Sequence, residues 1–456
     1  MFPFMAQGHF IPFLRLAKPL ASQGLTVSFI TTTMSASKLQ SHAVGSDIRF
    51  VRLSLPYIRG QLPALESTDC LSPTEGQQLF ISSHKLSVPF ERWLEKIIAE
   101  TAQKPACIIS DVFVPWTTDS ASKFRIPRVV FHTTGVMAAS LLQYLFTNPV
   151  PEIIGGRPII EIRDHSINVN LRRSELPQML RSELSFSPLP VLPVVQQVYA
   201  SAKESCAATL VNSFDGVEAE YVRYLEESTC KPVWLVAPPL DNAHEWVQIE
   251  SDCIAWLDSK KKKSVLYVSF GSQIFLSEDL IKAVAAGIEA SKQAFIWTIK
   301  DPIGSNVNSC DFLPEGFVEA TRDRGLVIHG WVPQLQILSH SSTACFMSHC
   351  GWNSTVESIS AGVPMVVWPM VFDQFINAKL VIEQLGIGLQ ICEGCDVIPS
   401  SDIVENMVKA AMVEGTGKEM DRRALKRKKS IEETSCKVNV ESFVGYILSL
   451  RPDQFN

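Results

Sequence analysis

The stretch Ala344-Cys-Phe-Met-Ser-His-Cys-Gly-Trp-Asn-Ser354 decides the fold class. Ala344 to Ser348 has the apolar composition of a buried strand, His349 to Gly351 has that of a tight turn, and a helix is expected over Trp352 to Ala361. Gly362, with Pro364 just beyond, would close that helix. A strand that leads through a glycine turn into a helix indicates a parallel α/β sheet.

The same alternation of short β-branched runs with helical segments extends over both halves of the chain. It predicts an α/β protein with two Rossmann-like, doubly wound domains. The expected strands are Thr26–Thr31, Ile48–Leu53, Ala106–Ile109 and Arg128–Phe131 in the first half, and Ser264–Phe270, Ala294–Thr298, Leu326–His329, Ala344–Ser348 and Pro364–Trp368 in the second.

A break in this pattern separates the two domains. After the expected strand Pro232–Val236, two prolines and several polar residues follow, up to His244. We predict a first domain over residues 1–236, a linker over 237–250 and a second domain over 251–437. The segments 52–90 and 149–193 are rich in Pro, Ser and Leu, and we expect them to be irregular loops that line a pocket.

Composition excludes several classes of function. The 456 residues are 46% hydrophobic and 19% charged, as in a folded globular protein. The net charge is -6, and no long basic block is present that could form a surface for binding nucleic acid. The eleven cysteines fit reduced thiols in a cytoplasmic protein. Cys392 and Cys395 form one C-x-x-C, but no second pair stands nearby to complete a zinc site. The chain has no apolar run of 18 residues and no signal-peptide pattern, so no membrane segment is expected.

The helix start at residue 352 has two possible roles. Free N–H groups and the positive end of the helix dipole bind phosphate, and His349, Asn353 and Ser354 could add hydrogen bonds without a metal ion. Alternatively, Ser354 and Glu357 have the spacing of an ordinary capping box. The local sequence leaves both readings open.

The wider segment resembles the signature box of plant family-1 UDP-glycosyltransferases. The matching residues are Trp331-Val-Pro-Gln334, His349-Cys-Gly-Trp-Asn-Ser354, Glu357 and Asp373-Gln374, which stand together over 44 residues. The resemblance implies a GT-B fold, in which the two domains face a cleft. It also implies that residues 438–456, which include a helical pattern, return to the first domain.

The resemblance assigns a role to each residue of the box. Trp331 would stack on uracil, the backbone of Gln334 would bind the uracil edge, and Glu357 would accept from the ribose hydroxyls. Gln374 implies glucose as the sugar, so UDP-glucose would be the co-substrate, with no metal and no other cofactor. The full set implied for donor binding is Thr133, Ser272, Trp331, Val332, Gln334, His349, Gly351, Trp352, Asn353, Ser354, Glu357, Asp373 and Gln374.

His9 and Asp111 are the candidate catalytic residues. We expect His9 to follow the end of a first strand, with a helix beginning just after Pro12, and Asp111 to end another strand, so that both lie at the carboxyl edge of the sheet. A neutral imidazole can take the proton of an acceptor hydroxyl, and a carboxylate behind it fixes the tautomer. Gln7 to Pro12 and Ser110 to Trp116 also resemble the family's base and its partner segment. Phe113 and Trp116 are expected in the acceptor pocket.

The expected activity is transfer of glucose from UDP-glucose to a hydroxyl of a phenolic, flavonoid or terpenoid acceptor, with inversion to a β-glucoside, by a monomer. The alternative is a non-catalytic binding protein on the same fold. It rests on the chain beginning within the first strand, which precedes His9. A hydrolase or dehydrogenase is excluded because neither a G-x-S-x-G nor a G-x-G-x-x-G motif stands in the required place.

Overall fold

The computed structural model describes most of the chain. The described residues are 1–40, 48–55, 67–68, 73–148, 157–164, 166–177, 180, 191–204, 207–237, 252–301, 307–392, 397–434 and 436–450. The predicted linker 237–250 lies outside them except for Ala237, and so does Cys395.

The chain forms two compact units. Unit 1 comprises Met1–Asn170, Met179–Pro238 and Ser435–Asn456, and unit 2 comprises Leu171–Gln178 and Pro239–Thr434. The segment Leu171–Gln178 packs with unit 2, although the chain before and after it packs with unit 1.

The sheet of unit 1 is parallel. Its strands are β1 (Val27–Thr32), β2 (Ile48–Leu53), β3 (Ile108–Asp111), β4 (Arg128–His132), β7 (Ala208–Val211) and β8 (Val233–Leu235). They pair as β1-β2 and as β3-β4-β7-β8. Met1 and Phe2 lie between these two groups, since the Ile30 N–H donates to the Met1 carbonyl and the Phe2 N–H donates to the Ile109 carbonyl.

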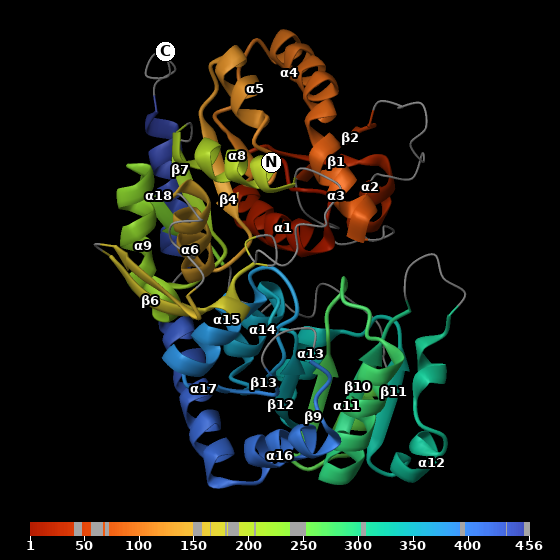
Figure 1. Ribbon diagram of the computed structural model, residues 1–456. Helices are drawn as coiled ribbons and strands as arrows, with labels where there is room; N and C mark the ends of the chain where they lie inside the picture. The colour runs from red at the N-terminus through yellow and green to blue at the C-terminus, as the bar shows by residue number, and fades with distance from the viewer. Residues whose placement is uncertain are drawn as a thin grey trace. The chain divides into compact units, whose positions relative to one another are not determined.

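Helices accompany this sheet. They are α1 (Gln7–Ser22), α2 (Thr33–Gln40), α3 (Pro73–Ser82), η3 (Ser83–Leu86), α4 (Ser87–Thr101), α5 (Thr117–Phe124), α6 (Val136–Thr147), α8 (Val191–Glu204), α9 (Asp215–Thr229) and α18 (Cys436–Ser449). Although α18 comes from the end of the sequence, it packs on β8 and α1 (Figure 1).

Unit 2 contains a six-stranded parallel sheet in the order β11-β10-β9-β12-β13-β14. The strands are β9 (Val265–Ser269), β10 (Ala294–Ile299), β11 (Gly325–His329), β12 (Thr343–Ser348), β13 (Met365–Val367) and β14 (Gly388–Gln390). The helices are α10 (Asp252–Asp258), α11 (Glu278–Ser291), η8 (Ser309–Phe312), α12 (Phe317–Thr321), α13 (Gln334–Ser339), α14 (Trp352–Ala361), α15 (Gln374–Lys379), the π-helix η9 (Leu380–Gln384), α16 (Ser401–Met412) and α17 (Gly415–Glu433).

Both sheets have a point where the strand order reverses. In unit 2 the chain runs outward from β9 to β11 and then returns to β12 on the other side of β9. In unit 1 it runs from the Met1–Phe2 stretch through β1 to β2 and returns to β3 on the other side. Ligands of doubly wound sheets bind at the carboxyl ends of the strands at such a point. The residues that follow Phe2, β3, β9 and β12 are therefore the expected ligand-binding positions.

Two predictions about local structure are wrong. The segments 52–90 and 149–193 are not wholly irregular, because they contain α3, η3, the start of α4, and the strands β5 (Ile159–Asp164) and β6 (Ile167–Arg172), followed by η4 (Arg173–Glu175). The helix expected after Pro12 begins earlier, at Gln7, and contains both Pro12 and Pro19. It tolerates them because its stability comes from a buried face that includes Phe13, Leu14 and Leu16.

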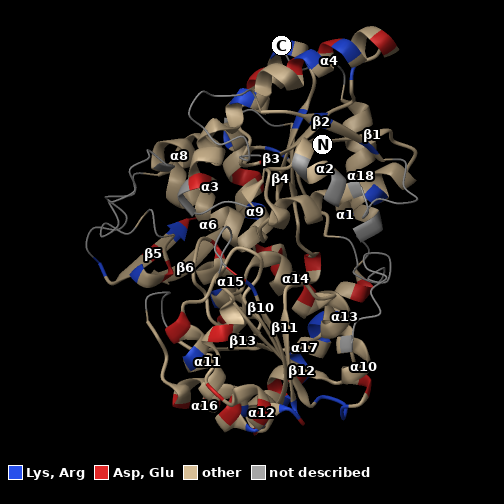
Figure 2. Cartoon of the chain, turned by 90° about the vertical axis from the view of Figure 1, so that its right-hand side faces the viewer, with Lys and Arg blue, Asp and Glu red and all other residues tan. Residues whose placement is uncertain are grey.

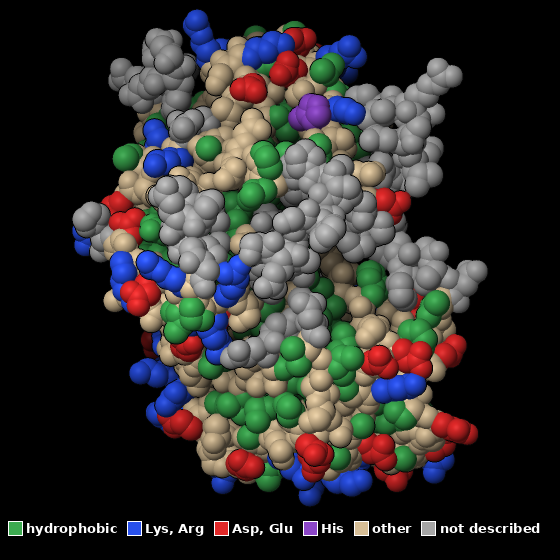
Figure 3. Space-filling model, viewed as in Figure 1, with side chains coloured by type: hydrophobic (Ala, Val, Ile, Leu, Met, Phe, Trp, Pro, Cys, Tyr) green, Lys and Arg blue, Asp and Glu red, His purple; other side chains and the backbone are tan. Residues whose placement is uncertain are grey.

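The described surface carries charges of both signs. In the view of Figure 2, acidic and basic residues are interspersed along the helices. The face in Figure 3 shows hydrophobic atoms scattered among them. Within the described part of the chain, no helix combines the length and hydropathy needed to cross a bilayer.

Candidate active site and nucleotide site

The reversal point of unit 1 holds a histidine–carboxylate pair. His9 lies in the first turn of α1, rather than directly at a strand end as predicted, and Asp111 is the last residue of β3. The His9 Nδ1 is 2.7 Å from Oδ2 of Asp111, whose side chain is fully buried. The N–H groups of Phe4 and Phe113 also donate to this carboxylate, at 3.3 and 2.9 Å. The carboxylate therefore holds the proton on Nδ1 and leaves the lone pair on Nε2.

Thr133 belongs to the same group of side chains. Its hydroxyl lies 3.1 Å from the His9 Nδ1, the nitrogen that also faces Asp111. Thr133 follows β4 and is buried. In this position the hydroxyl helps to fix the imidazole ring, in addition to any contact with a sugar.

Aromatic rings surround the imidazole. Phe4 and Phe113 contact it edge to face at centroid distances of 5.5 and 5.4 Å, and Phe80 of α3 lies 6.0 and 5.6 Å from those two rings. Trp116 instead packs against Phe2 and Phe90. We therefore retain Phe113, together with Phe4 and Phe80, as candidate acceptor-binding residues, and these contacts give no support to Trp116.

The reversal point of unit 2 holds a buried histidine between two glycines. His349 follows β12, and its ring fits between Gly271 and Gly351, where an added Cβ would come within 2.5 Å of the imidazole at either position. Its Nδ1 is buried and has no hydrogen-bond partner among the described residues. Burial, assisted by the charge of Lys300, lowers the pKa of His349 to about 4. The imidazole is thus neutral at pH 7 and available as a hydrogen-bond donor.

The helix after this turn forms as predicted. α14 spans Trp352–Ala361, and Gly362 ends it in the left-handed conformation at φ 71°. Its N-cap is Gly351 and makes no side-chain cap. The capping-box alternative for Ser354 and Glu357 is therefore wrong.

Those two side chains are instead held by Gln334. Its Nε2 donates to Oε2 of Glu357 at 2.8 Å and to the hydroxyl of Ser354 at 3.1 Å. Trp331, three residues earlier, is 53% exposed, so its ring is accessible for stacking, whereas Val332 is buried. The structure thus brings the predicted nucleotide residues of α13 and α14 together.

The predicted sugar-binding residues begin α15. The Gln374 Oε1 accepts from the N–H groups of Met370 and Val371 at 2.9 and 3.0 Å, and the Asp373 carboxylate accepts from Asn377 at 2.9 Å. Trp352 and Asn353 start the neighbouring α14, and Ser272 follows the Gly271 turn after β9.

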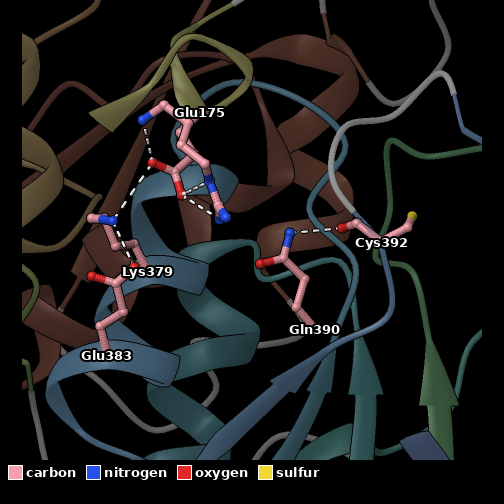
Figure 4. A network of polar contacts seen from close by, with 6 residues as sticks. Glu175, Lys379, Glu383, Gln390 and Cys392 are labelled. Atoms are coloured by element: carbon pink, nitrogen blue, oxygen red, sulfur yellow. Dashed lines mark hydrogen bonds and ion pairs between the residues drawn. The ribbon is translucent and has the colours of Figure 1, made fainter. Parts of the chain in front are cut away.

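An ion-pair network supports α15 from the segment Leu171–Gln178 (Figure 4). Glu175 and Lys379 are both nearly buried, with 3.6 Å between Oε2 and Nζ. Arg172 donates to Glu175 from its backbone and side chain, and Lys379 also contacts Glu383 at 2.7 Å. This contact could not be predicted from the sequence, because 204 residues separate Glu175 from Lys379.

The described residues contain no cluster of three or more His, Cys, Asp or Glu that could hold a metal ion. The Cys392 Sγ lies 3.7 Å from the Val397 carbonyl, and Cys395 is outside the described residues.

Comparison with known proteins gives consistent matches. A family model described as "UDP-glucoronosyl and UDP-glucosyl transferase" matches residues 242–421. The chain is 35% identical over 403 residues to scopoletin glucosyltransferase of Nicotiana tabacum, with 85% of this chain and 82% of that protein covered. It is 33% identical over 403 residues to UDP-glucose flavonoid 3-O-glucosyltransferase 7 of Fragaria ananassa, with 85% and 80% covered.

A solved structure shows the same fold. Phytolacca americana UGT2, complexed with UDP-2fluoro-glucose and pterostilbene, superposes with a TM-score of 0.80 at 26% identity, covering 98% of this chain and 99% of that chain. The predicted GT-B fold is therefore confirmed.

Proposed function

This chain belongs to the plant family-1 UDP-glycosyltransferases, and from that premise we propose that it transfers glucose from UDP-glucose to a hydroxyl of a small, apolar, aromatic acceptor. The observation that carries the proposal is the His9 imidazole, held at 2.7 Å by the buried Asp111 carboxylate. The chain is an enzyme of this family, so the non-catalytic alternative is set aside. We also propose that it acts in the cytoplasm as a monomer.

The chemistry follows from the tautomer. With its Nδ1 proton donated to Asp111, His9 takes the acceptor hydroxyl proton on Nε2. The acceptor oxygen forms a bond to the anomeric carbon while the bond from that carbon to the UDP oxygen breaks, and UDP leaves with the electron pair. A single displacement inverts the anomeric centre, so the α-linked donor yields a β-glucoside.

We propose that unit 2 binds the donor. Trp331 stacks on uracil, Gln334 binds the uracil edge through its backbone, and Glu357 accepts from the ribose hydroxyls. Ser272, His349, Asn353 and Ser354 hold the diphosphate at the start of α14, where the helix dipole favours negative charge. The neutral His349 donates a hydrogen bond and requires no counter-charge or metal ion. Trp352, Asp373 and Gln374 bind the glucose.

The proposed acceptor class rests on the rings around His9. Phe4, Phe80 and Phe113 form an apolar surface beside the base, which suits a flat aromatic molecule. Two relatives are named for such acceptors, scopoletin and flavonoids. The aromatic surface and these names together favour a phenolic over an aliphatic alcohol.

The test is to incubate the protein with UDP-glucose and pooled phenolic acceptors, and to measure UDP release and the mass increase of one hexose. The anomeric coupling constant of the product should show a β-linkage. A product with an α-linkage, or UDP release that does not depend on any acceptor, would contradict the proposal.

A further inference from the structure

The Glu357 carboxylate, which is proposed to bind the ribose hydroxyls, is connected through Gln334 to a buried tyrosine. Tyr267 lies in the middle of β9, is 1% exposed, and its ring stacks on Phe346 at 4.9 Å. Its hydroxyl donates to Oε1 of Gln334 at 3.2 Å. The amide of Gln334 thus joins the phenol on one side to Glu357 and Ser354 on the other.

This arrangement fixes which way the Gln334 amide points. Its oxygen accepts from the phenol, so its NH₂ group faces the Glu357 carboxylate and donates to it. A flipped amide would place its oxygen against the carboxylate, which accepts only when ionised. The carboxylate therefore sets the direction of the amide, the phenol holds the amide oxygen at its other end, and the amide in turn holds one carboxylate oxygen in place.

Tyr267 remains a donor throughout the working pH range. Burial raises the pKa of its phenol, and the charge of Glu357 raises the pKa further, outweighing the Ser269 and Thr298 hydroxyls, which lower it. The phenol keeps its proton, so the direction of the hydrogen bond does not change with pH.

We propose that Tyr267 is a positioning residue for the ribose end of the donor, which acts through Gln334 on Glu357 and lets the site distinguish UDP from its 2′-deoxy analogue. This inference rests on the proposed role of Glu357 in binding the ribose hydroxyls. A carboxylate held in one orientation gains more from a ribose diol than a mobile one, because less freedom is lost on binding.

The experiment measures binding of UDP and of 2′-deoxy-UDP by calorimetry, which does not require turnover. Wild-type protein should bind UDP about tenfold or more tightly than 2′-deoxy-UDP. Tyr267→Phe keeps the ring on Phe346 and should weaken UDP binding about threefold to tenfold, with a much smaller change for 2′-deoxy-UDP. The preference for ribose should therefore fall.

Two further variants complete the design. Tyr446→Phe is the matched control, because it removes a phenol that donates to the Ala207 carbonyl at 3.0 Å within unit 1, and it should leave the UDP preference unchanged. Gln334→Leu breaks the same chain at the partly exposed α13 and should reduce the preference as Tyr267→Phe does, which covers the case in which the buried substitution prevents folding.

The outcomes distinguish a failure of the proposed function from a failure of the proposed role of Tyr267. A wild-type protein that binds neither nucleotide would overturn both the proposed function and this inference. A wild-type protein that prefers UDP, with variants that keep this preference or lose affinity equally for both nucleotides, would overturn the role of Tyr267 alone.

Discussion

Two histidine–aspartate pairs in this molecule have nearly the same N···O distance, through Nδ1 of His9 and Nε2 of His329, and different surroundings. His9 and Asp111 in unit 1 are 2.7 Å apart, and His329 and Asp301 in unit 2 are 2.6 Å apart. Both stand at the carboxyl side of a parallel sheet, since His329 ends β11 and Asp301 follows β10 by two residues. The N···O distance alone therefore does not distinguish the two pairs.

Their surroundings decide what each pair can do. The Asp111 side chain is fully buried and His9 is 17% exposed, whereas Asp301 and His329 are 28% and 52% exposed. A buried carboxylate that is also held by the N–H groups of Phe4 and Phe113 cannot turn away from the imidazole, but an exposed one shares its hydrogen bonds with water. The comparison shows that a fixed partner in an apolar environment, more than a short distance, makes a histidine a candidate base.

The largest expected effect is the loss of the base. His9→Ala should lower kcat by about 10²–10⁴-fold, because no group remains to take the acceptor proton. UDP binding, measured by calorimetry, should stay within about twofold of wild type because the substitution lies in unit 1. The rate is measured as steady-state UDP release with a phenolic acceptor that the wild-type protein glucosylates.

His329→Ala is the matched control for that variant. It removes an imidazole with a similar carboxylate contact and should keep kcat within about twofold of wild type. If the two variants lost similar activity, or if His9→Ala turned over normally, the conclusion that only the His9–Asp111 pair supplies the base would be wrong.

The second effect separates the two carboxylates. Asp111→Asn replaces an acceptor by an amide that can present NH₂ to the Nδ1 of His9, which favours the wrong tautomer, and kcat should fall about 10²-fold or more. Asp301→Asn should leave kcat unchanged. Thermal melting of both variants establishes that they are folded, and an Asp111→Asn enzyme with normal kcat would show that the carboxylate does not direct the base.

The limits of individual helices and strands could be predicted from the sequence better than the contacts between distant segments. The limits of α14 were predicted at both ends because an apolar run, a glycine turn and Gly362 mark them locally. The pairing of His9 with Asp111 followed from topology, although α1 begins before Pro12 rather than after it. α3 was missed because Pro, Ser and Gln weaken its periodicity, and tertiary packing of Leu79 and Phe80 overrides that weak propensity.

The supporting side chains could not be predicted for a related reason. Tyr267 and Gln334 are 67 residues apart, and Glu175 and Lys379 are further apart still. Each of these residues is ordinary for its own element: an aromatic residue in a strand, a glutamine at a helix start, a lysine at a helix end. Only the folded chain shows that they contact each other.

The third effect tests the apolar surroundings of His9. Phe113→Leu keeps the backbone donor to Asp111 but removes a ring that contacts His9 and Phe80, so KM for an aromatic acceptor should rise about threefold to tenfold. KM for UDP-glucose should not change. Phe50→Leu, which removes a ring paired with Phe29 elsewhere in unit 1, is the control and should leave both values unchanged.

The smallest effect concerns the exposed pair and is measured as stability. The backbone N–H of Ser309, followed by the His329 side chain, holds the pKa of Asp301 below its usual 3.8, against a smaller opposing effect of burial. A lowered carboxyl pKa stabilises the folded state above the unfolded value, and this contribution is lost as the pH falls through the folded value. Asp301→Asn should therefore cost less than about 1 kcal/mol at neutral pH, because the pair is solvent-exposed.

The difference in melting midpoint between Asp301→Asn and wild type should shrink as the pH is lowered through the usual aspartate range. At neutral pH the same measurement on Asp111→Asn should give a larger loss, since Asp111 is fully buried and accepts from His9, Phe4 and Phe113. Equal losses at the two positions would mean that burial does not distinguish the pairs, and the assignment of His9 as the base would then rest on activity measurements alone.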